Sequence, residues 1–315
     1  MGNINNTIEY INKMATEDPV GFIERTEARY DAILDSVANK VASNGSGHQL
    51  ILLAGPSSSG KTTSARKIAE KLERMGRKAY SVSMDDFYLN KEDAPKLPDG
   101  SKDFESVHSL DIPLIKKTMS DLLSKGEADI PHFDFKISER TDEWSHMTIG
   151  KKDIVILEGL HALNPLISDD LPKDSILKIY INVSSRIYDE NEKIVLNKRN
   201  MRFVRRLVRD FYFRNSSVEN TYGMWGQVSK GEDMYLFPLR DTADIKINTI
   251  HLYEPCIFKD IALDHLKSVD RLSPFYSDAQ RLINSLERFV SIDAKLLPRD
   301  SLIVREFIGD FHYDK

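Results

Sequence analysis

The sequence of 315 residues contains one cysteine, Cys256, and lacks long apolar runs. A single cysteine excludes an intramolecular disulfide framework and a cysteine-based metal site, and it is typical of a reducing cytoplasm. The longest apolar runs, at 50–54 and 154–157, are far too short to span a bilayer. The first fifteen residues lack the basic start and apolar core of a signal peptide. We therefore expect a cytoplasmic protein without a membrane partner.

Strong net charge is also missing, because 44 basic and 49 acidic residues leave a net charge of −5. Such a balance is not typical of a general nucleic-acid binder, so nucleic acid is not expected as a partner. His108, His132, His146 and His161 show no metal-type spacing such as H-E-x-x-H. We interpret each of these histidines as structural.

The sequence does contain apolar runs that alternate with helical patterns. Runs typical of strands buried on both faces lie at 49–54, 153–157 and 176–183. Two further strands are predicted at 78–84 and 243–248. Helices are predicted at 7–43, with a start at Asp18-Pro19, and at 61–75, 111–125, 196–214 and 251–289. This alternation predicts an α/β fold with a doubly wound, mostly parallel sheet, which binds ligands at the carboxyl ends of its strands.

The segment after the first predicted strand matches the phosphate-binding pattern G-x-x-x-x-G-K-[ST]. The matching residues and the one that follows are Gly55, Pro56, Ser57, Ser58, Ser59, Gly60, Lys61, Thr62 and Thr63. The glycines let backbone amides point at phosphate oxygens, and the helix opening at Lys61 adds its positive end. Lys61 would neutralise the β and γ phosphates, and Thr62 would ligate Mg²⁺. The pattern predicts a bound nucleoside triphosphate with Mg²⁺; the alternative is an ordinary Gly/Ser turn.

A second pattern, Asn90-Lys91-Glu92-Asp93, fits the guanine-reading N-K-x-D pattern of GTPases. In GTPases this pattern ends a late strand, whereas here it follows the phosphate loop closely and lies in a polar stretch at 90–103. We interpret the match as a coincidence and expect ATP rather than GTP.

Two acidic positions follow predicted strands. Asp85, in the pair Asp85-Asp86, can accept the proton of an attacking hydroxyl, although such a pair also suits a turn. Glu158 resembles a Walker B carboxylate that holds Mg²⁺ directly or through water. The alternative for Glu158 is a capping or salt-bridged side chain.

The stretch from Lys198 to Arg214 holds six arginines and one acid, Asp210. A helical period places Arg202, Arg205, Arg206 and Arg209 on one side. The other side is apolar and consists of Phe203, Val204, Leu207, Val208 and Phe211. We expect the helix to pack by its apolar face and to present its guanidinium groups to ATP phosphates as a mobile lid. A solvated basic face or a nucleic-acid patch is the alternative.

Together, these residues resemble the uridine kinase and phosphoribulokinase family of P-loop kinases over about residues 49–250. The landmarks are 55–63, Asp85-Asp-Phe-Tyr88, Asp103-Phe-Glu105, Pro131-His-Phe-Asp-Phe135 with Arg140, Glu158-Gly159, Arg205-Arg-Leu-Val-Arg-Asp210 and Ala243-Asp244. The tail at 300–309 is similar to a bacterial branch of uridine kinase-like proteins. The resemblance implies a kinase domain at 49–250, with helical extensions at 1–48 and 251–315.

The resemblance also implies roles for single residues. Asp85, Lys61, Arg206 and Arg209 would be catalytic, Thr62 and Glu158 would bind the metal, and the acceptor site would contain Tyr88, Glu105, Phe133 and Arg140. The sequence departs from uridine kinases at Glu105, where Asp is usual, and at Phe133, where Tyr is usual. It also departs at Ser138, which stands where a His reads the pyrimidine, and at Ser216, where a further arginine is expected.

The expected activity is ATP-dependent phosphorylation of a small-molecule hydroxyl, most simply the 5′-hydroxyl of uridine or another nucleoside. Aromatic residues near the acceptor loops, among them Phe87, Phe104 and Phe135, would stack on a base or belong to the core. One alternative is a phosphosugar, pantothenate or glycerate as acceptor, for which Lys96, Lys102, Lys136 and Arg140 offer cations. Another is a regulator that binds ATP without catalysis. A homo-oligomer is compatible with the kinase activity and with each of these alternatives.

Overall fold

The computed structural model describes residues 5–43, 47–135, 137–299 and 301–309. Its main sheet is fully parallel and has the strand order β2-β5-β1-β6-β9. The strands are β1 (Leu50–Ala54), β2 (Ala79–Ser83), β5 (Ile154–Gly159), β6 (Ile176–Asn182) and β9 (Ile245–Asn248). This arrangement confirms the predicted α/β fold with a parallel sheet.

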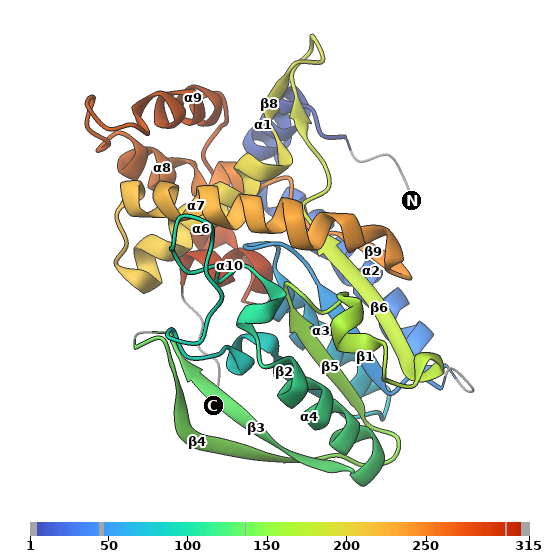
Figure 1. Cartoon of the computed structure of the whole chain (residues 1–315). Coiled ribbons are helices and arrows are strands. Elements are labelled where there is room, and N and C mark those ends of the chain that lie inside the picture. Colours follow the sequence, from blue (N-terminus) through green and yellow to red (C-terminus); the bar gives the residue numbers. More distant parts are fainter. Residues whose placement is uncertain (1–4, 44–46, 136, 300, 310–315) are drawn as a thin grey trace.

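Both faces of the sheet are covered, as the continuous apolar runs predict. In β1, Ile51 and Leu53 join one apolar cluster, whereas Leu50 and Leu52 join the other. The first cluster includes residues of helices α2 (Pro19–Ala42), α3 (Lys61–Arg74), α6 (Lys198–Arg214) and α8 (Glu254–Leu266). The second includes residues of α4 (Ile112–Lys125) and α5 (Pro165–Ser168), and Figure 1 shows α4 beside β2 and β5.

The segments before and after the sheet are helical. Helix α1 (Ile8–Glu17) is followed by Asp18, whose side chain caps α2 by accepting from the amide of Gly21. The predicted helix start at Asp18-Pro19 is thus confirmed. After β9 come α8, α9 (Tyr276–Leu286) and α10 (Leu302–Ile308). Buried residues of α1, α2, α9 and α10 belong to the same apolar cluster as the sheet.

Several elements were not predicted from the sequence. The strands β3 (Glu127–Asp134) and β4 (Glu139–Thr148) form an antiparallel hairpin, which Figure 1 shows as an arm beside the sheet. A second small hairpin joins β7 (Ile187–Tyr188) and β8 (Ile194–Leu196). Helix α7 (Val218–Gly231) continues into a π-helical turn (Glu232–Leu236) and a 3₁₀ turn (Phe237–Thr242).

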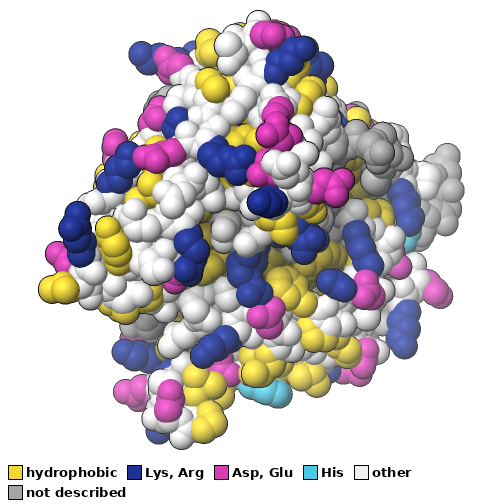
Figure 2. All heavy atoms as spheres, turned by 90° about the horizontal axis from the view of Figure 1, so that it is seen from above, with side chains coloured by type: hydrophobic (Ala, Val, Ile, Leu, Met, Phe, Trp, Pro, Cys, Tyr) yellow, Lys and Arg dark blue, Asp and Glu magenta, His cyan; other side chains and the backbone are white. Residues whose placement is uncertain are grey.

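The surface carries charges of both signs. On the face seen in Figure 2, Lys and Arg side chains are interspersed with Asp and Glu, in keeping with the small net charge. Among the residues that the structure describes, no helix combines the length and apolar character needed to cross a bilayer.

Candidate active site

The predicted phosphate loop joins β1 to α3 at the carboxyl edge of the sheet. Gly60 caps α3 with φ +84°, a left-handed conformation that favours glycine. A Cβ on Gly55 would lie 2.5 Å from the carbonyl oxygen of Ile181, so the loop passes too close to β6 for a side chain there. The first amides of α3, at Lys61 and Thr62, lie at a helix start, where backbone donors are available to an anion.

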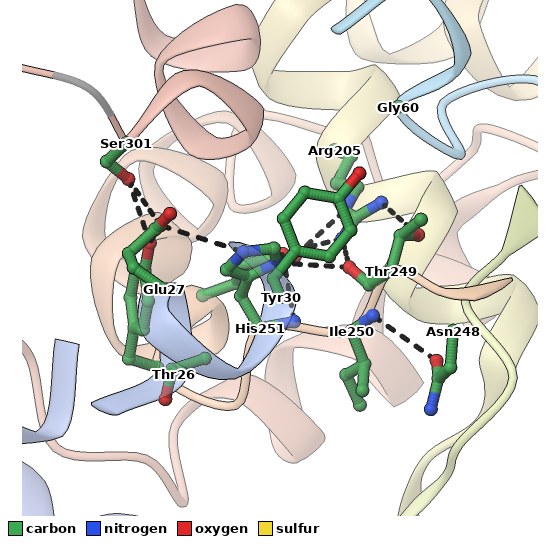
Figure 3. A network of polar contacts seen from close by, with 12 residues as sticks. Thr26, Glu27, Tyr30, Gly60, Arg205, Asn248, Thr249, Ile250, His251 and Ser301 are labelled. Atoms are coloured by element: carbon green, nitrogen blue, oxygen red, sulfur yellow. Dashed lines mark hydrogen bonds and ion pairs between the residues drawn. The ribbon is translucent and has the colours of Figure 1, made fainter. Parts of the chain in front are cut away.

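Three carbonyls of the loop are held from the outside. The Arg202 guanidinium donates to the carbonyl oxygen of Ser57 (2.9 Å), and that of Arg205 donates to Ser58 (3.2 Å). The Thr249 hydroxyl donates to the carbonyl of Ser59 (2.8 Å). Figure 3 shows Arg205 and Thr249 together, close to Gly60. These bonds fix the curvature of the loop.

Two of the α6 arginines that were predicted to be exposed, Arg202 and Arg205, are therefore not on the surface. Arg202 and Arg205 are fully buried and form bidentate ion pairs with Glu232 and Glu254, respectively. The expectation that these two guanidinium groups face ATP phosphates on a mobile lid was wrong. Their partners come from α8 and from the turn after α7, so the spacing within α6 could not reveal them. Of the residues predicted on the apolar face, Phe203, Val204, Leu207 and Val208 are buried, whereas Phe211 is 42% exposed.

Arg206 and Arg209 lie further along α6, and both pair with Asp210. Arg206 also donates to the side chain of Ser57 in the phosphate loop (3.1 Å). Arg209 is close enough to Asp85 to favour its ionised form. Arg206 therefore borders the loop, buried rather than presented to solvent, and Arg209 acts on the carboxylate side of the site.

The predicted carboxylates follow strands that neighbour β1. In the sheet register, Glu158 lies opposite Leu53 on one side and Ser83 on the other, and Asp85 follows in the turn Met84–Phe87. The Thr62 hydroxyl donates to Glu158 (2.9 Å). The structure thus brings Lys61, Thr62, Glu158 and Asp85 together, as predicted from the strand ends.

The pKa values of Glu158 and Asp85 depend on the protein atoms around them and on the charge of Lys61. Burial raises the pKa of Glu158 to about 7, and Lys61 partly opposes this change. Asp85 is reached by solvent, yet the protein atoms around it displace enough water to raise its pKa. Lys61, Arg214 and Arg209 act in the opposite direction on Asp85. A carboxyl with a raised pKa is a stronger base once ionised.

The predicted acceptor residues come from three different segments. Tyr88, Phe133 and Phe135 form an aromatic cluster with ring centroids 5.0–5.9 Å apart, and the Phe135 side chain is 60% exposed. Phe87, in contrast, is buried in the core. Burial and repulsion from Glu232 raise the pKa of Glu105 to about 7. Glu105 lies against the backbone of Gly231, where an added Cβ would meet it at 2.4 Å.

Arg140 is engaged with protein groups. Its guanidinium donates to Asp111 (3.2 Å) and to the carbonyl of Tyr88 (3.4 Å). Its amide donates to the side chain of Asn90 (2.8 Å). The N-K-x-D match that begins at Asn90 lies in a loop against the β3–β4 hairpin, which agrees with its interpretation as a coincidence.

Sequence reasoning missed several residues that border the site. Glu232 accepts from the amide of Ser57 (2.8 Å) as well as from Arg202. Arg214, one turn beyond Arg209, acts electrostatically on Asp85. The Thr63 hydroxyl donates to Glu306 of α10. Only Arg214 had a local signal, since it lies in the arginine-rich helix; Glu232 and Glu306 contact the loop from segments far away in the chain.

The parallel sheet and its phosphate loop define a P-loop kinase fold. The model of the phosphoribulokinase / uridine kinase family matches residues 50–253. The chain belongs to this family, and it is a phosphotransferase that acts on an alcohol group of a small molecule.

Individual relatives are distant from this chain. It is 27% identical to a uridine kinase of Lactobacillus helveticus over 197 residues, which cover 62% of this chain and 84% of that protein. It is 31% identical to uridine-cytidine kinase A of Dictyostelium discoideum over 198 residues, or 62% of this chain and 35% of that protein. A structure described as a possible uridine kinase from Bacillus stearothermophilus aligns with 70% of this chain and 99% of its own, at 15% identity and a TM-score of 0.46.

Proposed function

We propose that this protein transfers the γ-phosphoryl group of ATP to the 5′-hydroxyl of a nucleoside, with uridine as the first candidate. The observation that carries the proposal is the grouping of Asp85 and Glu158 around Lys61, beside a loop shaped to hold phosphates. A base, a phosphate-binding cation and a carboxylate for a metal are the parts that phosphoryl transfer requires.

In this proposal, Asp85 accepts the proton of the acceptor hydroxyl. The oxygen of that hydroxyl then forms a bond to the γ phosphorus. The bond between the γ phosphorus and the bridging oxygen breaks, and ADP leaves. Lys61, Arg206 and Arg209 stabilise the negative charge that spreads over the transferring group. The amides of the loop between Gly55 and Thr63 hold the remaining phosphate oxygens.

Thr62 and Glu158 fit a magnesium ion, because both supply oxygen atoms as metal ligands and these two oxygens lie 2.9 Å apart. When bound, Mg²⁺ would neutralise phosphate charge. The burial that raises the pKa of Glu158 would be offset by a cation beside it, since an adjacent positive charge favours the carboxylate.

A nucleoside is favoured by the shape and charge of the acceptor side. The cluster of Tyr88, Phe133 and Phe135 leaves Phe135 largely exposed, and such a ring can stack on a planar base. Glu105 suits a sugar hydroxyl, because its carboxylate can accept hydrogen bonds.

An anionic acceptor such as a phosphosugar has less support. Of the four cations offered for it, Lys102 donates to the carbonyls of Glu92 and Ala94, and Arg140 pairs with Asp111. Lys136 lies outside the described residues.

The test is incubation with Mg-ATP and a panel of uridine, cytidine, ribulose 5-phosphate, pantothenate and glycerate, followed by mass spectrometry. We expect a nucleoside monophosphate. A product from another acceptor alone would refute the nucleoside assignment, and ATP binding without any product would favour the regulator.

The same assay tests the base. Asp85→Asn is expected to lower turnover by roughly 10²–10⁴-fold, the usual contribution of a general base, while Mg-ATP binding by calorimetry changes little. Asp93→Asn is the matched control, since Asp93 is exposed in the N-K-x-D loop and we expect it to leave turnover and the preference for ATP unchanged. Turnover near the wild-type value in Asp85→Asn would exclude Asp85 as the base.

A further inference from the structure

The last described helix, α10, packs directly against the phosphate loop. A Cβ on Gly60 would lie 3.2 Å from the Cδ1 atom of Ile303, so this side chain covers the loop at the start of α3. Phe307 is buried, and the Arg205 guanidinium lies 5.5 Å from its ring centroid. Helix α10 therefore rests on both α3 and α6, the two helices that shape the loop.

This packing brings a carboxylate to the nucleotide site. The hydroxyl of Thr63, the last residue of the predicted phosphate-binding segment, donates to Glu306. Burial raises the pKa of Glu306, while Arg209, Arg205 and Lys61 favour its ionised form. The carboxylate thus lies beside the helix start and shares the field of Lys61 and Arg209, two of the cations assigned to ATP.

A triphosphate bound in the loop would lie in the same positive field. The positive end of α3 and the ammonium group of Lys61 attract any anion that fits. Two anions beside these groups repel each other, and the protein atoms that crowd Glu306 and raise its pKa limit the screening of this repulsion by water.

We propose that α10 is a latch on the nucleotide site, in which the Glu306 carboxylate competes with the triphosphate for the start of α3. The proposal rests on the proposed function, because it assumes that a nucleoside triphosphate binds this loop. The latch leaves the phosphoryl transfer step as proposed above. It changes only the affinity of the protein for the nucleotide.

The other end of α10 is anchored away from the loop. Ser301, just before the helix, donates to Glu27 of α2 (2.7 Å) and lies 2.9 Å from the Tyr253 hydroxyl, as Figure 3 shows for Ser301 and Glu27. Tyr253 also donates to Glu27. This anchor holds the base of the latch, so displacement of Glu306 need not release the whole tail.

The experiment measures the dissociation constants of Mg-ATP and of inorganic triphosphate by calorimetry on the full-length protein. Glu306→Gln keeps the size of the side chain and an oxygen that can accept from Thr63, but it removes the charge. We expect both probes to bind about three- to tenfold more tightly to this variant, because a repulsive charge beside the phosphates is removed. Glu306→Lys, which reverses the charge, is expected to bind them more tightly still.

Glu287→Gln is the matched control, because Glu287 is half exposed and pairs with Lys267 at the end of α9. We expect it to leave both dissociation constants unchanged. Thermal melting without nucleotide verifies that each variant is folded.

The outcomes separate the latch from the proposed function. Equal or weaker binding to Glu306→Gln, with wild-type protein binding Mg-ATP, would overturn the latch and leave the kinase assignment intact. Tighter binding of Mg-ATP but not of inorganic triphosphate would also overturn it, since the competition is for phosphate. If no variant binds either probe, both proposals fail.

Discussion

Glu158 and Glu105 are carboxyls whose proton affinity depends on the fold. Burial is the main cause in both cases and raises each pKa to about 7, from an ordinary value of 4.5. In the empty protein such groups are partly protonated near neutral pH. A ligand that brings a cation to Glu158 would favour its ionised form, so metal binding and proton release are coupled there.

This proton affinity predicts how stability depends on pH. A carboxyl with a raised pKa binds more protons in the folded than in the unfolded chain, so the free energy of unfolding falls as pH rises through 7. For Glu158, which is 5% exposed, the loss between pH 6.5 and 8 is on the order of 1 kcal/mol. His161, whose pKa burial lowers to about 4, is neutral in the folded chain but partly protonated in the unfolded chain near pH 6.5, so it opposes part of this loss at the acid end of the window.

We expect Glu158→Gln to make this dependence shallower, because glutamine has the same shape and does not titrate, whereas Glu105 still contributes. Thermal melting of the nucleotide-free protein from pH 6.5 to 8 measures it, with Glu287→Gln as a variant that should keep the wild-type slope. A slope that is identical in Glu158→Gln and in the wild type would show that Glu158 has no raised pKa.

At the scale of elements, α6 supports the phosphate loop through buried ion pairs. Arg202 bonds both oxygens of Glu232 (2.7 Å each), and these two residues also hold the carbonyl and the amide of Ser57. Glu232 opens a π-helical turn, a rare geometry that is frequent at functional sites. The pair therefore links the segment after α7 to the loop.

Breaking one side of this pair should be costly. Arg202→Met leaves Glu232 buried without its cation, and we expect it to lower the free energy of unfolding by about 3–5 kcal/mol. The double variant Arg202→Met/Glu232→Leu should lose less than the sum of the two single variants. Urea unfolding of all four proteins measures this coupling, and strictly additive losses would contradict it.

These elements also show how far local sequence patterns reach. The strand at 154–157 and the loop at 55–62 are visible because continuous apolar residues and glycine spacing are local signals. Strand β4 has no such signal, since most of its side chains are exposed and no apolar alternation marks a buried face. The partnership of Arg202 with Glu232 joins residues thirty positions apart, which no helical period encodes.

At the scale of the whole molecule, the two extensions meet beside the kinase core. Glu27 of α2 contacts Tyr253 and Ser301, and the Tyr30 hydroxyl lies 2.6 Å from that of Ser64 in α3. The sequence indicated helices on both sides of the kinase region. It could not indicate that they pack together on α3, because each contact joins residues that are distant in sequence.

This packing predicts that residues 49–250 do not fold independently. Tyr30 and Leu34 of α2 and Phe258 of α8 are almost fully buried in the apolar cluster that covers the sheet. Removing the helices that carry them exposes that apolar surface, at a cost of roughly 25 cal/mol per Å². We expect the isolated segment to lack a cooperative thermal transition and the near-ultraviolet circular dichroism of the full chain. A cooperative transition at the temperature of the full-length protein would show instead that the extensions are accessory.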